Sequence, residues 1–115
     1  MTTPTVTPVT ISNGTALSPA IPLAPRHLTG IAVPSTWNAA NLSLQASYDG
    51  TNFFEFCDKA GLYAIVVPAV AGYVIGLDPA VFRGVVMIKI RSGTLASPVN
   101  QTGDQILQVI TTPLT

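Results

Sequence analysis

Charged residues are scarce in this chain, which has five Lys and Arg, five Asp and Glu and a net charge of zero over 115 residues. In a typical soluble domain, roughly a quarter of the residues are charged. The first charge is Arg26, and residues 60–77 and 92–103 contain none. A surface with so little charge favours contact with other protein or with lipid. The even balance of sign argues against nucleic-acid binding, which needs a basic surface.

The chain also has little of the chemistry that catalysis requires. Cys57 and His27 are its only cysteine and histidine, so an internal disulfide is excluded and a zinc site has too few ligands. No G-x-S-x-G motif accompanies the histidine. We expect Cys57 to be a buried, inert thiol and His27 to lie in a loop or at a strand end.

Carboxylates offer one further catalytic possibility, because glycosidases use a pair of them. Glu55 and Asp58 are the nearest pair without an obvious turn role, but their odd spacing points them to opposite faces of a regular strand. The sequence has neither an EF-hand loop nor a glycine-rich phosphate loop. We therefore expect no enzymatic activity, no metal and no cofactor.

A membrane span is considered for the uncharged residues 60–77, which are long enough to cross a bilayer. Pro68, three glycines and several β-branched residues interrupt this segment, and its flanks carry no basic cluster. Two short strands, at residues 63–67 and 73–77, fit better. The amino-terminal residues lack the pattern of a signal peptide, so we expect synthesis in a cytoplasm and no membrane.

Glycine and proline, nineteen residues in all, are spread along the whole chain and leave no room for a long helix. Residues 41–48 alternate strictly between apolar and polar. This pattern predicts a strand with Leu42, Leu44, Ala46 and Tyr48 in a core and the residues between them in water. The Asp49-Gly50 pair that follows predicts a hairpin, with residues 53–57 as the returning strand.

Two later segments follow the same pattern. Residues 85–91 predict a strand with Ile88 and Ile90 inward and Lys89 and Arg91 outward. Residues 105–111 are apolar on both faces, which indicates a central strand or one covered by a partner. Val6 to Ile11 contains Pro8, which predicts an edge strand or an extended arm.

Turn signals about every 8–12 residues indicate a sandwich or a barrel. The predicted fold class is all-β: a single jelly-roll-like β-sandwich of about eight or nine short strands. We expect residues 9–115 to form this domain and residues 1–8 to form an extended arm.

Trp37 lies at a Pro-Ser-Thr corner next to Asn38, and it allows two interpretations. An exposed tryptophan beside amides and hydroxyls could stack on a sugar. A tryptophan that closes one end of the sandwich core is the interpretation we favour, because large aromatic side chains dominate cores.

Four segments carry a family resemblance: residues 44–53 (LQASYDGTNF), 77–84 (LDPAVFRG), 88–94 (IKIRSGT) and 98–101 (PVNQ). Together they resemble small β-sandwich virion proteins of tailed bacteriophages, over most of the chain from about Thr10 to Val109. The resemblance implies a structural protein of the virion, made in the host bacterial cytoplasm. It most commonly implies a capsid decoration (cement) protein that binds the major capsid protein and is often a trimer.

The expected function is therefore capsid decoration, in which the protein stabilises the head shell by binding between capsid subunits. The alternatives are a carbohydrate-binding protein and a head–tail or tail accessory protein of the virion. The candidate interface residues come from the arm, from the Trp37 corner and from the segment richest in cations; they are Thr3, Thr5, Val6, Thr7, Trp37, Arg83, Lys89 and Arg91.

Overall fold

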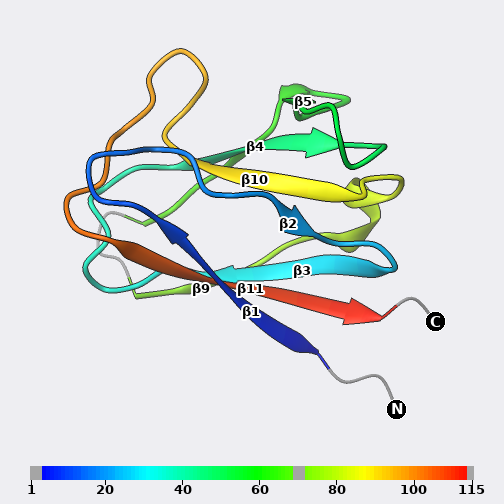
Figure 1. Cartoon of the computed structure of the whole chain (residues 1–115), viewed down its shortest axis with the longest axis horizontal. Helices are drawn as coiled ribbons and strands as arrows, with labels where there is room; N and C mark the ends of the chain where they lie inside the picture. Colours follow the sequence, from blue (N-terminus) through cyan, green and yellow to red (C-terminus); the bar gives the residue numbers. More distant parts are fainter. Residues whose placement is uncertain (1–3, 69–71, 114–115) are drawn as a thin grey trace.

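The computed structural model describes residues 4–68 and 72–113 and is all-β. Two antiparallel sheets lie one over the other (Figure 1). The β1 sheet has the order β1-β11-β3-β9, and the β4 sheet has the order β2-β10-β4-β5, with β8 also paired to β4. The β1 sheet comprises β1 (Thr5–Ile11), β11 (Gln105–Pro113), β3 (Arg26–Ala32) and β9 (Val74–Gly76). The β4 sheet comprises β2 (Ile21–Pro22), β10 (Met87–Ser92), β4 (Leu42–Ser47), β5 (Phe54–Glu55) and β8 (Ala64–Ile65).

Two small elements complete the described structure. The strands β6 (Cys57–Asp58) and β7 (Gly61–Leu62) form a separate ribbon, and the 3₁₀ turn η1 (Pro79–Phe82) precedes β10. Asp78 caps η1 by accepting a hydrogen bond from the Ala80 N–H at 3.0 Å. In η1, Pro79 stands where its missing N–H is not needed.

The connectivity is that of a jelly roll. The chain alternates between the two sheets from β1 to β4 and again from β8 to β11, and strands from the beginning of the sequence pair with strands from its end: β1 with β11, and β2 with β10. Such long-range antiparallel pairing in two packed sheets defines this fold. The predicted jelly-roll-like β-sandwich is therefore confirmed.

The core lies between the sheets and is built by the period-two alternation of their strands. Leu42 and Leu44 of β4, together with Ile88 and Ile90 of β10, are almost fully buried, as the sequence pattern predicted. Leu107 fills the opposite side from β11. Burial of each such side chain contributes about 1.5–3 kcal/mol, so these positions supply much of the stability of the fold.

Trp37 belongs to this core. Its side chain is only 6% exposed, and its Nε1 donates a hydrogen bond to the Ala40 carbonyl at 3.1 Å. The ring is part of the buried core cluster, in agreement with the core interpretation. It offers no face for stacking on a sugar and no surface for a partner.

The alternation predicted for residues 41–48 is wrong at its end and on its outer face. Tyr48 is exposed because β4 ends at Ser47, whose hydroxyl accepts the Gly50 N–H at 2.8 Å and begins the turn. On the outer face, Ser43 and Ser47 are buried instead of lying in water. This face of β4 is covered by other parts of the chain.

Cys57 also differs from its prediction, since it is exposed. The two-residue strand β5 ends before it, and Cys57 pairs with Leu62 in the separate β6–β7 ribbon. This ribbon carries the thiol away from the sandwich core.

Residues 5–8 are part of the β1 sheet. Thr5 faces Thr111 and Pro8 faces Gln108 across an unbroken register. The boundary placed after residue 8 thus falls inside β1, because the backbone pairing of this strand begins three residues earlier. β1 is an edge strand, as Pro8 predicted.

Candidate interaction surface

The outer face of the β1 sheet carries no charge. Residues that pair across antiparallel strands share a face of the sheet, and the registers align Val6, Ile110, Gly30 and Gly76 in one row. The second row contains Pro8, Gln108, Ala32 and Val74, and Thr10 pairs with Ile106 beyond it. We call this set of ten residues the uncharged face.

Large apolar side chains of the uncharged face are open to solvent. Val6, Val74 and Ile106 are each between 50% and 69% exposed. Ile110 instead lies over Gly30, where an added Cβ would approach the isoleucine Cδ1 to 3.4 Å. A face that exposes large apolar side chains and carries no charged residue can be covered by another protein without removing an ion from water.

The position of β11 explains its two apolar faces. Leu107 and Val109 point into the core, whereas Ile106 and Ile110 point outward from a strand that lies between β1 and β3. The strand is central, which is one of the two interpretations that its sequence allows. Its outward residues belong to the uncharged face.

Pro8 protects the open edge of the same sheet. A proline has no N–H, so its pair with Gln108 fits the type in which the two residues exchange no backbone hydrogen bonds. The proline nitrogen then points to the open edge, where a donor for a further strand is missing. Edge-to-edge pairing of β1 with another strand is thereby disfavoured.

Replacement of Pro8 by valine should therefore allow β1 to pair with a strand of another molecule. The valine N–H adds a hydrogen-bond donor at the open edge, between the N–H groups of Val6 and Thr10. We expect larger species than the parent protein to form with rising concentration. Size-exclusion chromatography with light scattering measures this. Pro19→Val changes an exposed proline outside the strands and is the control. Identical size distributions for Pro8→Val and the parent would contradict the protective role.

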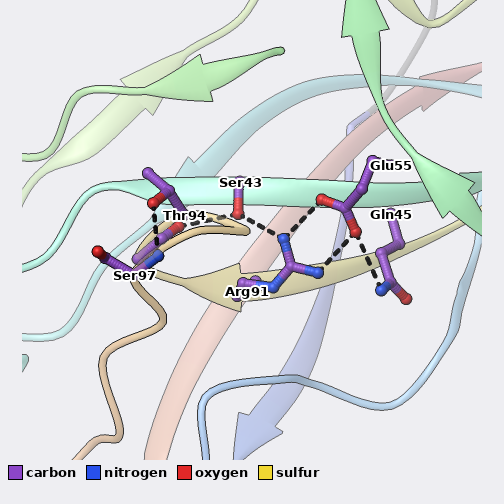
Figure 2. A network of polar contacts seen from close by, with 7 residues as sticks. Ser43, Gln45, Glu55, Arg91, Thr94 and Ser97 are labelled. Atoms are coloured by element: carbon purple, nitrogen blue, oxygen red, sulfur yellow. Dashed lines mark hydrogen bonds and ion pairs between the residues drawn. The ribbon is translucent and has the colours of Figure 1, made fainter.

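The outer face of the β4 sheet is built differently, around an ion pair (Figure 2). Arg91 of β10 and Glu55 of β5 form two hydrogen bonds of 2.6 Å, one from each terminal nitrogen of the guanidinium. The same carboxylate accepts a bond from Gln45 at 3.1 Å. Ser43 accepts from Arg91 at 3.2 Å and donates to the Gly93 carbonyl at 2.8 Å. These bonds cross the three strands β10, β4 and β5.

The ion pair is well shielded from water. The side chains of Arg91 and Glu55 are 8% and 20% exposed. The hydrogen bonds from Arg91 lower the pKa of Glu55 below its ordinary value, against the opposing effect of burial. Arg91 points away from the core, as predicted, but it is buried beneath Glu55. It is not available as a candidate interface residue.

The remaining predicted cations do not form one patch with Arg91. Lys89 lies over the Phe53 ring, with its Nζ 4.3 Å from the ring centroid. Arg83 is exposed after η1 and lines a cavity of about 140 Å³ together with Arg26 and His27. Arg26 is held by Thr111, to which its Nε donates a hydrogen bond at 2.8 Å.

The arm candidates are divided between two sides of β1. Val6 lies on the uncharged face, whereas Thr5 and Thr7 alternate to the opposite side and are exposed. Thr3 lies outside the described residues. Of the eight predicted interface residues, Val6 is thus the one that the structure places on the uncharged face.

The sequence pattern predicts that Ile106 and Ile110 share one side of their strand, but it does not indicate that Val74 and Ala32 lie on the same face of the sheet. Val74 joins Ala32 only through the pairing of β9 with β3, across more than forty residues. No short-range signal in the sequence indicates this register.

Signs of a catalytic or metal site are few in the described part of the chain. Residues 4–68 and 72–113 contain no cluster of three or more His, Cys, Asp or Glu that could hold a metal ion. Glu55 is engaged with Arg91, and Asp58 accepts the Ala60 N–H at 2.8 Å. Within the same residues, no helix has the length and apolar character needed to cross a bilayer.

Comparison with known proteins gave no relative: no family model, no curated protein and no solved structure matches this chain.

Proposed function

We propose that this chain is a non-enzymatic structural protein of a tailed-bacteriophage virion, a capsid decoration protein that binds between capsid subunits. The observation that supports this function most strongly is the uncharged face of the β1 sheet, with Val6, Val74 and Ile106 exposed on it. The proposed partner of this face is the major capsid protein.

The distribution of charge supports an assembly role. The four strands of the β1 sheet contain one Asp, Glu, Lys or Arg residue, Arg26, which lies at the end of β3. A contact made by uncharged side chains avoids the large cost of removing ions from water. Each Å² of apolar surface that a partner covers contributes about 25 cal/mol.

The jelly-roll fold is compatible with a role in a virus particle. Jelly rolls occur in viral capsid domains and also in lectins, so the fold alone does not select a function. The resemblance of residues 44–53, 77–84, 88–94 and 98–101 to small virion proteins favours the first of these classes. Homo-oligomers, with a trimer favoured, are part of the proposal and follow from this resemblance.

The test is binding to phage heads that lack the protein. Ile106→Glu places a carboxylate at an exposed position of the uncharged face, and we expect at least about a hundredfold weaker binding, equivalent to about 2.7 kcal/mol. Co-sedimentation with purified heads measures the occupancy. Stability should change by no more than about 0.5 kcal/mol, because Ile106 is a surface residue.

Leu95→Glu is the matched control. Leu95 is 52% exposed, much like Ile106 at 50%, but it lies in the loop after β10 and not on the uncharged face. It should leave occupancy unchanged. Equal binding by Ile106→Glu and the parent protein would overturn the proposed role of this face, and absence of binding by the parent would overturn the proposed function.

A further inference from the structure

Two exposed aromatic rings lie together at the β4–β5 hairpin. Tyr48 is 68% exposed and Phe54 is 58% exposed. Their ring centroids are 6.1 Å apart and their planes differ by only 13°. Phe54 pairs with Ala46 near the end of β4, and Tyr48 follows directly after that strand, so the hairpin brings the two rings together. The two rings form what we call the aromatic platform.

The turn beneath the platform is held in one conformation by Asp49. One oxygen of its carboxylate, Oδ1, accepts the N–H groups of Thr51 and Asn52, each at 2.9 Å, and Oδ2 accepts the Asn52 side-chain amide at 2.8 Å. These bonds hold the pKa of Asp49 far below its ordinary value. The Ser47 hydroxyl donates to the same carboxylate at 3.0 Å. The turn therefore holds the backbone between Tyr48 and Phe54 in one conformation before any ligand arrives, which lowers the entropic cost of binding.

From this geometry we infer that the aromatic platform binds a neutral oligosaccharide. The C–H bonds on one side of a pyranose ring with equatorial substituents form an apolar face that fits an aromatic ring, whose own face is electron-rich. Tyr48 is the more exposed of the two stacked rings and can hold one sugar unit, while Phe54 supports it from the side. The Thr51 hydroxyl lies exposed on the adjoining turn, where it can meet a sugar hydroxyl.

The local charges favour a neutral ligand over an anionic one. Asp49 carries a negative charge beneath the platform, and Glu55 is neutralised by Arg91. Lys89, on the neighbouring strand β10, is engaged with the Phe53 ring. Single-stranded nucleic acids also stack on aromatic rings, but they need a basic groove to hold their phosphates. The platform has no such groove among the residues that build it.

The platform is separate from the uncharged face. Figure 1 shows the β4–β5 hairpin at the far edge of the β4 sheet, with β1 and β11 in the opposite layer. A molecule that binds a particle through the β1 sheet would keep Tyr48 and Phe54 in solvent. The inference does not depend on the proposed function, because the isolated protein can be tested for sugar binding.

The experiment is titration of the isolated protein with cellohexaose and chitohexaose, followed by calorimetry and by NMR shifts of the hairpin amides. We expect millimolar or tighter binding to one of these glycans. Loss of a stacked ring in Tyr48→Ala should weaken this binding about tenfold, whereas Tyr48→Phe should keep it within about threefold. Tyr73→Ala removes a tyrosine that is 46% exposed outside the hairpin, and it should have no effect.

Three results would overturn the inference. The first is no binding of either glycan by the parent protein. The second is binding that Tyr73→Ala weakens as much as Tyr48→Ala. The third is a Tyr48→Ala variant that keeps its glycan affinity but no longer binds phage heads, because the platform would then be a protein contact. Failure of head binding by the parent protein leaves the glycan measurement intact.

Discussion

Gly93→Ala is expected to destabilise the protein by about 4 kcal/mol, a large part of the 5–15 kcal/mol typical of a whole domain. Gly93 follows β10 with φ at +89°, a conformation that side chains strongly disfavour. A Cβ at this position would lie 2.5 Å from the Ser97 carbonyl oxygen and 2.7 Å from the Val99 nitrogen. Both atoms belong to the backbone, so no rotation of a side chain relieves the clash.

The displaced segment matters because Gly93 connects the end of β10 to the start of β4. Its N–H donates to the Asn41 carbonyl at 2.7 Å, and its carbonyl accepts the Ser43 hydroxyl at 2.8 Å. A shift of residues 93–98 therefore also disturbs the buried end of β4. The loss of these bonds adds to the strain in the loop itself.

Denaturant unfolding followed by the fluorescence of Trp37, the single tryptophan, measures the effect. The matched control is Gly84→Ala, because Gly84 has a similar φ of +83° but no atom within 4 Å of the added Cβ. The control isolates the cost of the backbone conformation, about 1–3 kcal/mol. If both variants lose the same stability, the steric account of Gly93 is wrong.

The sequence was most informative where a pattern is local. The alternation of residues 41–48 identified β4, and the same pattern in residues 85–91 placed Ile88 and Ile90 in the core. Asp49-Gly50 correctly predicted the return of the chain into β5. These features depend on neighbours along the chain, and the period of two reports which side chains share a face.

The sequence was least informative where distant segments meet. Alternation placed Arg91 outward, but it could not show that Glu55, 36 residues away, lies across β4 from it. For the same reason Ser43 was predicted in water and is buried. The aromatic platform was missed because Tyr48 was assigned to the core, whereas the turn at Ser47 ends the alternation one residue earlier.

The Arg91–Glu55 pair is expected to have the second largest effect on stability. Removal of one partner of a buried ion pair costs about 3–5 kcal/mol, and the 20% exposure of Glu55 places this pair near about 3 kcal/mol. Arg91→Met should therefore lower the free energy of unfolding by about 3 kcal/mol. Glu55→Gln should do the same, because it leaves a buried guanidinium without its counter-charge.

The double variant distinguishes a coupled pair from two independent contacts. Arg91→Met with Glu55→Gln removes both charges, so neither remains buried without a partner. We expect its loss of stability to fall short of the sum of the two single losses by more than about 1 kcal/mol. Additive losses would show that the two side chains contribute separately.

The pH dependence of stability gives an independent test of the same pair. Because Arg91 lowers the pKa of Glu55 from its ordinary value of 4.5, the folded state binds this proton less readily than the unfolded state does. The contribution of the pair is therefore fully present above about pH 4.5 and is lost as the pH falls through the lowered pKa. Glu55→Gln should flatten this part of the curve. Asp49 also has a lowered pKa but is present in both proteins, so the difference between the two curves reports Glu55 alone. Parallel curves for the parent and Glu55→Gln would mean that Arg91 does not stabilise the ionised carboxylate, and the strands β10, β4 and β5 would then be held together by packing and backbone pairing alone.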